Sequence, residues 1–73
     1  MALPKDATKT PDVILRIALV KEMQARDLYE ELARECSVDF VRELLEKLQN
    51  EESKHVHMVE EMLGRLEAGT RLT

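Results

Sequence analysis

The stretch Gln49-Asn50-Glu51-Glu52-Ser53-Lys54-His55 places an acid and an imidazole, Glu52 and His55, three residues apart. They share one face of a predicted long helix, on which apolar residues recur in alternating steps of four and three. This spacing is typical of a helix packed against another helix. The face consists of Val41, Leu45, Leu48, Glu52, His55, Val59, Met62 and Leu66. An acid and an imidazole inside an apolar stripe are costly unless something satisfies them, and a metal ion would satisfy both.

Length and composition limit the chain to one small helical domain. Charged residues make up 36% of the 73 residues, and Tyr29 and Phe40 are its aromatic residues. This composition favours helices over a β-sandwich or barrel. A chain this short buries only about 60% of its unfolded surface, so a monomer would be marginally stable. We therefore expect the chain to oligomerise.

Several classes of protein are disfavoured by the same sequence. The net charge is −4 and no basic stripe offsets it, which argues against nucleic-acid binding. Cys36 is the single cysteine, so an intramolecular disulfide and an all-cysteine metal site are excluded. The longest apolar run, residues 17–20, is far shorter than the roughly 20 residues of a membrane span. The first residues lack the apolar segment of a secretory signal, so we expect a soluble cytoplasmic protein.

The chain in order predicts two helices joined by a short turn. The first begins at Pro11, with Thr10 as N-cap, and runs to about Cys36. The second runs from about Val38 to Ala68, with Ser37 as N-cap and Gly69 as its stop. The predicted organisation is a flexible arm over residues 1–10, a helical hairpin over 11–68 and a tail over 69–73.

The first helix brings a second carboxylate to the height of Glu52. Its expected contact face consists of Leu15, Ala18, Glu22, Ala25, Tyr29, Leu32 and Cys36. With the turn at Ser37, Glu22 and Glu52 each lie 15 residues from it, or about 22 Å along the helices. Glu22, Glu52 and His55 are therefore expected to converge.

A second apolar face on the first helix predicts a further contact between subunits. Val13, Ile17 and Val20 point away from the expected contact face. A helix that is apolar on all sides is usually buried on all sides, and one hairpin cannot bury both of these faces.

Two carboxylates and one imidazole suit iron, manganese or zinc, but they are too few to complete a site. Four-helix di-metal proteins use a Glu from each of two helices and a Glu-x-x-His from each of the other two. Two copies of this chain would supply that set around two metal ions. The predicted fold is therefore an all-α antiparallel two-helix hairpin that dimerises into a four-helix bundle.

The chain resembles the ferritin-like and rubrerythrin-like superfamily of di-iron carboxylate proteins. The matching residues are Glu22, Tyr29 seven positions later, and Glu52 with His55. Full-length members carry the motif twice in one chain, whereas this chain carries it once. It is therefore similar to the two-helix members, notably the encapsulated ferritins.

The resemblance implies a ferroxidase that oxidises Fe(II) at a site shared between two subunits, for iron storage or oxidative-stress protection. It implies Glu22 as a terminal ligand, Glu52 as a bridging ligand and His55 as the nitrogen ligand of iron. Tyr29 would donate a hydrogen bond beside the site. The implied partners are a second copy, a larger ring and an encapsulin-type shell, which would place the protein inside a nanocompartment.

Alternative interpretations stay open at this point. The same site would suit rubrerythrin-like reduction of peroxide, or the chain is a metal-free interaction module whose polar residues set the register of its helices. Glu22 has Arg26 four residues on and would form an ordinary surface ion pair. His55 and Tyr29 would then be residues of the helix interface.

Overall fold

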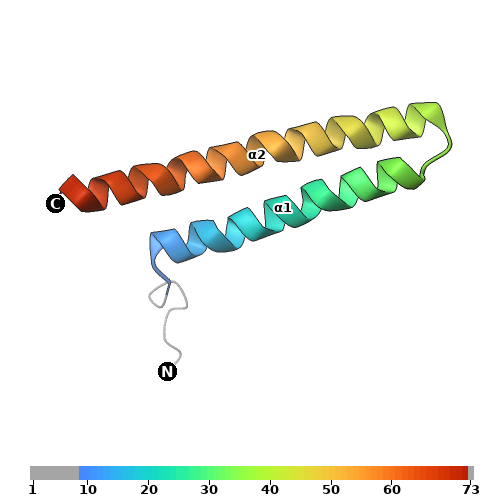
Figure 1. Ribbon diagram of the computed structural model, residues 1–73. Coiled ribbons are helices and arrows are strands. Elements are labelled where there is room, and N and C mark those ends of the chain that lie inside the picture. Colours follow the sequence, from blue (N-terminus) through green and yellow to red (C-terminus); the bar gives the residue numbers. More distant parts are fainter. Residues whose placement is uncertain (1–8, 73) are drawn as a thin grey trace, which may run out of the picture.

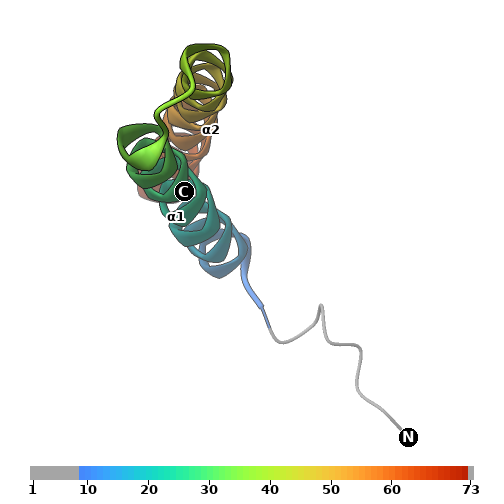
Figure 2. The ribbon, with the colours of Figure 1, turned by 90° about the vertical axis from the view of Figure 1, so that its right-hand side faces the viewer.

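The computed structural model describes residues 9–72 and shows two helices folded into an antiparallel hairpin (Figure 1). Helix α1 spans Pro11–Glu35 and helix α2 spans Asp39–Leu72. Viewed from the turn, the two helices lie side by side (Figure 2). The predicted all-α hairpin is confirmed. Most of the arm predicted over residues 1–10 lies outside the described part of the chain.

Helix α1 starts as the sequence predicts. Thr10 is the N-cap in an extended conformation, and Pro11 follows at the first helical position. The Thr10 carbonyl accepts the first helical hydrogen bond from the Ile14 N–H, at 3.0 Å. The Thr10 hydroxyl donates to the Asp12 carboxylate and lowers the pKa of Asp12. Proline at this position removes an N–H that would otherwise lack a partner.

The turn differs by one residue from the prediction, which made Ser37 the N-cap of the second helix. The Val38 carbonyl accepts the first hydrogen bonds of α2, from the N–H groups of Val41 at 3.1 Å and Arg42 at 2.9 Å. The Arg42 guanidinium donates to the Cys36 carbonyl at 3.2 Å and pairs with the Asp39 carboxylate. These contacts fasten the end of α1 to the start of α2, so Ser37 belongs to the linker.

Helix α2 ends later than predicted. It continues through Gly69 to Leu72, so the expected tail is helical over residues 69–72. Neither Gly64 nor Gly69 has a positive φ angle. Gly69 therefore does not take the left-handed conformation by which glycine stops a helix. The last turns of α2 run past the start of α1, as Figure 1 shows.

Replacing Gly64 by alanine is expected to stabilise the hairpin. A Cβ atom at Gly64 would meet no atom within 4 Å, and alanine favours a helix over glycine by about 1 kcal/mol. Thermal unfolding followed by circular dichroism at one fixed chain concentration should show a higher midpoint. Gly69→Ala, close to the helix end, should give a smaller rise. A lower midpoint for Gly64→Ala would mean that another chain approaches this glycine closely.

The contact between α1 and α2, here called the hairpin seam, is rotated slightly from the predicted faces. Ala33 and Val56 are its buried residues, with 5% and 4% of their surface exposed. The predicted seam residues Leu32 and Met62 are more than 40% exposed, and their neighbours Ala33 and Leu63 lie inside. The cause is that each apolar arc is wider than one helix contact requires.

The remaining apolar arcs form one face of the hairpin, here called the open face. Counted at about 100° per residue, its members lie about 80–120° from Glu22 or Glu52 in the same rotational sense. Because both helices are right-handed and run antiparallel, this rotation leads to the same side of the hairpin. The exposed apolar side chains of the open face are Ile14, Leu28, Leu32, Leu44, Met58 and Met62.

The opposite side of the hairpin is polar. Gln49 on α2 donates a hydrogen bond to the Glu30 carboxylate on α1 at 3.2 Å, and Arg34 pairs with Glu30 at 3.1 Å. Arg42 and Glu60 lie on the same side of α2. The hairpin therefore has one apolar and one charged broad face, with few large side chains buried between its helices.

Candidate metal centre

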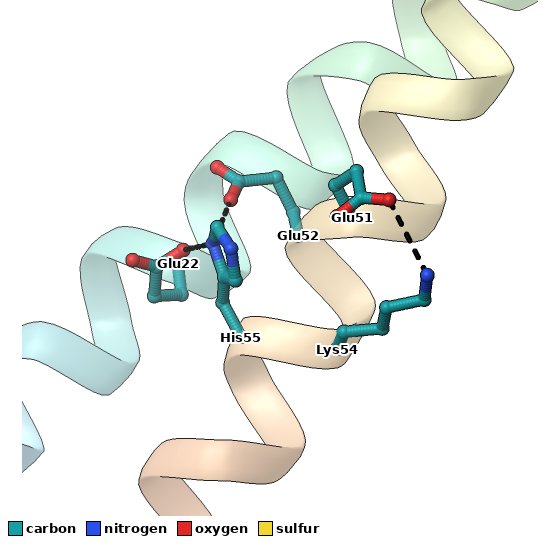
Figure 3. Close-up of polar contacts among 5 residues, drawn as sticks. All are labelled: Glu22, Glu51, Glu52, Lys54 and His55. Carbon is teal, nitrogen blue, oxygen red and sulfur yellow. Dashed lines mark hydrogen bonds and ion pairs between the residues drawn. The ribbon is translucent and has the colours of Figure 1, made fainter.

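Glu22 on α1 and both Glu52 and His55 on α2 meet across the hairpin seam (Figure 3). The His55 ring lies between the two carboxylates. Its Nδ1 atom is 3.1 Å from Glu22 Oε2 and 2.7 Å from Glu52 Oε1. The ligating atoms of the three residues all lie within 4.8 Å of one another. The cluster thus presents two oxygen donors and one nitrogen donor to a common point.

The hairpin geometry explains why these residues meet. Glu22 lies 13 residues before the end of α1 at Glu35, and Glu52 lies 13 residues after the start of α2 at Asp39. At 1.5 Å per residue both are about 20 Å from the helix ends at the turn. His55 follows Glu52 by three residues, so it lies nearly one helical turn along the same side. The structure therefore has the convergence that equal distances from the turn predict.

The cluster opens towards the apolar face of the hairpin. The side chain of Glu52 is 17% exposed, that of Glu22 is 30% exposed and that of His55 is 47% exposed. His55 was expected in the middle of the contact between the helices, but the buried residue there is Val56. His55 lies at the edge of the seam, about 60° from Glu52 towards the open face. A partner covering that face would therefore also cover the cluster.

Hydrogen bonds to Glu22 and Glu52 raise the pKa of His55 above its ordinary value. The two carboxylates hold the protonated ring more strongly in the folded hairpin than in the unfolded chain. This contribution to stability is complete below the unfolded pKa of about 6.5 and is lost as pH rises through the higher folded pKa. A metal ion at the same nitrogen competes with this proton, so metal binding should weaken as pH falls.

Glu52→Gln is expected to lower the pKa of His55 towards its ordinary value. The substitution keeps the shape of the side chain but removes the negative charge that holds the protonated ring. The measurement is an NMR titration of the histidine rings in metal-free protein. His57 is the internal control because its partner is Glu60, at 3.6 Å, outside the cluster. An unchanged titration of His55 would show that Glu52 does not hold the ring in solution.

The neighbouring charged residues pair outside the cluster. Arg26 contacts Asp27 at 3.3 Å, so the alternative ion pair between Glu22 and Arg26 is not formed. Glu51 pairs with Lys54 at 3.3 Å and points away from α1 (Figure 3). The three clustered side chains therefore keep only one another as polar partners in the described part of the chain.

Tyr29 lies half-buried in the hairpin seam, two helical turns from Glu22. That spacing corresponds to about 10.5 Å along α1. Within residues 9–72, no hydrogen bond joins Tyr29 to the cluster. Its role as a hydrogen-bond donor beside the metal stays a prediction, as do the ligand roles of Glu22, Glu52 and His55.

The apolar residues that flank the cluster were not singled out from the sequence. Leu28 and Leu44 are about half exposed on the open face. The signal that could have found them is the width of the apolar arc, which on each helix exceeds what a single neighbouring helix covers. Periodicity alone assigned that width to one contact.

Comparison with known families adds a finding that the geometry alone does not supply. The family model described as Rubrerythrin matches residues 13–73, which is well over half of the chain. The chain belongs to the rubrerythrin family. The chain has no significant match among curated proteins or solved structures.

Rubrerythrin-family membership confirms the predicted relationship to ferritin-like proteins. Members of the rubrerythrin family typically bind iron, and the family points to oxidoreductase chemistry in general. The match includes Glu22, Glu52 and His55. In the described residues, no helix is long and apolar enough to cross a membrane.

Proposed function

We propose that two copies of this hairpin join through their open faces and oxidise Fe(II) at a site built from both clusters. The observation that carries the proposal is the position of Glu22, Glu52 and His55, which converge at the edge of an otherwise apolar, exposed face. Apolar patches of this kind mark surfaces that bind a partner. A covered cluster would be dry and rich in carboxylates.

The donor set fits iron. Carboxylate oxygen together with imidazole nitrogen suits Fe(II), and three donors from one chain leave a site incomplete. The four-helix di-metal pattern needs four carboxylates and two histidines. Two copies of Glu22, Glu52 and His55 supply that number. Nδ1 of His55 is the nitrogen that faces both carboxylates.

The position of the cluster along the helices also favours a two-fold arrangement. Glu22 has 11 residues of α1 before it and 13 after it. A two-fold axis through the cluster, perpendicular to the helices, would overlap two hairpins along nearly the whole of α1. A cluster near either end of the hairpin would leave much of the open face uncovered.

The protein's part in the reaction is to bind and align the substrate ions. Two Fe(II) ions each give one electron to dioxygen, which takes up two protons and leaves as hydrogen peroxide, with two Fe(III) as the other product. The carboxylates of Glu22 and Glu52 neutralise the charge that increases as Fe(II) becomes Fe(III). The apolar side chains of the open face exclude bulk water, which strengthens these electrostatic interactions.

Native mass and metal analysis of one sample, loaded with Fe(II) without oxygen, tests the proposal. We expect an even number of chains and two iron ions for every two chains. Iron should raise the thermal unfolding midpoint over that in chelator, because a ligand that binds only the folded form stabilises it. Equal midpoints would favour a metal-free helical module. Comparing the rates with oxygen and with peroxide tests the alternative of peroxide reduction.

A further inference from the structure

A second apolar surface lies on α1, on the side opposite the hairpin seam. Val13, Ile17 and Val20 form it, and all three are 40–53% exposed. Together with Arg16 and Lys21 they line an open groove of about 330 Å³ on the helix surface. We call this surface the outer patch. It points away from α2, so the proposed two-fold contact through the open face leaves Val13 and Val20 exposed.

The order of residues in the outer patch is self-complementary. Val13 and Val20 are equally far from the point between Arg16 and Ile17, and so are Asp12 and Lys21. If two α1 helices cross antiparallel at that point, Val13 of each chain meets Val20 of the other. Asp12 of each chain then meets Lys21 of the other, so that opposite charges face each other at both ends of the contact.

The other side chains fit the same arrangement. Arg16 contacts Asp12 of its own chain at 3.9 Å, and both side chains are more than half exposed. An arginine with an exposed head can lay its apolar stem over Ile17 of the other chain while the guanidinium stays in water. The groove between side chains one turn apart is where the ridge of a neighbouring helix packs.

We infer that the outer patch binds the outer patch of a second copy of this chain through an antiparallel α1–α1 contact. The apolar centre and the mirrored order of Asp12 and Lys21 select a second copy as the occupant. This contact does not depend on metal or on the open face. Because each chain then has two different two-fold surfaces, chains link alternately into assemblies larger than a dimer.

The test compares native masses of the full-length wild type, Ile17→Asp and Gln24→Asp. Ile17→Asp puts a carboxylate in the apolar centre and should weaken the contact by about a hundredfold, which is the size of a hot-spot loss. We expect it to reduce the assembly to dimers that keep the wild-type iron content. Gln24→Asp adds the same charge to an exposed position of α1 outside the outer patch and should leave the mass unchanged. An unchanged mass for Ile17→Asp would overturn the inference.

A charge exchange tests the predicted pairing separately. Lys21→Glu alone brings an acid against Asp12 of the other chain and should reduce the mass, whereas Asp12→Lys with Lys21→Glu should restore it. Circular dichroism checks that helix content is kept, since a lysine in the first turn of a helix is slightly unfavourable. Failure of the double substitution to restore the mass, with helix content intact, would overturn the pairing.

Failure of the proposed function has a different signature. If the open-face contact does not exist, the wild type forms only α1–α1 dimers, and Ile17→Asp converts them to monomers. If the outer-patch contact does not exist, the wild type stops at the iron-binding dimer and Ile17→Asp leaves it unchanged.

Discussion

Glu52→Ala is expected to lower the rate of Fe(II) oxidation by at least about 100-fold, because even residues that only support metal ligands are worth about 10–100-fold. Glu52 is the least exposed of the three clustered side chains and lies 2.7 Å from the His55 ring. Its loss removes a carboxylate from each half of the proposed site. The measurement is ferric absorbance after air is admitted to protein loaded with Fe(II) anaerobically.

Glu51→Ala is the matched control for this substitution. It removes the same side chain from the adjacent residue, whose carboxylate pairs with Lys54 outside the cluster. The control should oxidise Fe(II) at the wild-type rate. Oxidation by Glu52→Ala at the wild-type rate would contradict the assignment of the cluster as the reaction site.

Leu44→Asp is expected to abolish the open-face contact and iron binding together. Leu44 is 54% exposed and lies eight residues before Glu52, about 12 Å away along α2. The aspartate cannot reach the cluster, but it would bury an unpaired charge in the contact between two hairpins. Native mass should show loss of this contact, and metal analysis should show a loss of iron of about tenfold or more at the same Fe(II) concentration.

The control for Leu44→Asp is Met23→Asp, which also replaces an exposed apolar residue with an acid. Met23 is 37% exposed and lies about 100° from Glu22 in the opposite rotational sense, towards the charged face. Its iron content and mass should match the wild type. Iron binding by Leu44→Asp at the wild-type level would mean that a single hairpin is sufficient for the site.

The helix boundaries show which local signals were sufficient. Thr10 and Pro11 begin α1 where the sequence predicts, because the capping carbonyl and the constrained proline ring act within a few residues. The end of α2 was predicted wrongly at Gly69, since a glycine stops a helix only when its backbone turns left-handed. Here both glycines stay helical, and residue type alone does not reveal that choice.

The seam shows where periodicity reaches its limit. The steps of three and four identified the correct side of each helix, including Leu45 and Val59. They did not distinguish Val56 from His55 or Ala33 from Leu32, because a one-residue shift rotates the face by only about 100° within a wide apolar arc. Which part of that arc faces α2 depends on how the two helices pack.

The sequence by itself determined two helices, a short turn between them, and the equal distance of Glu22 and Glu52 from that turn. Those properties are local, since they depend on capping, on helical rise and on residue counts along one chain. The tertiary structure decided that His55 lies at the edge of the seam, with Nδ1 between both carboxylates, and that the remaining apolar residues gather on one side. Those properties depend on the relative rotation of two packed helices, which side-chain contacts across the seam set.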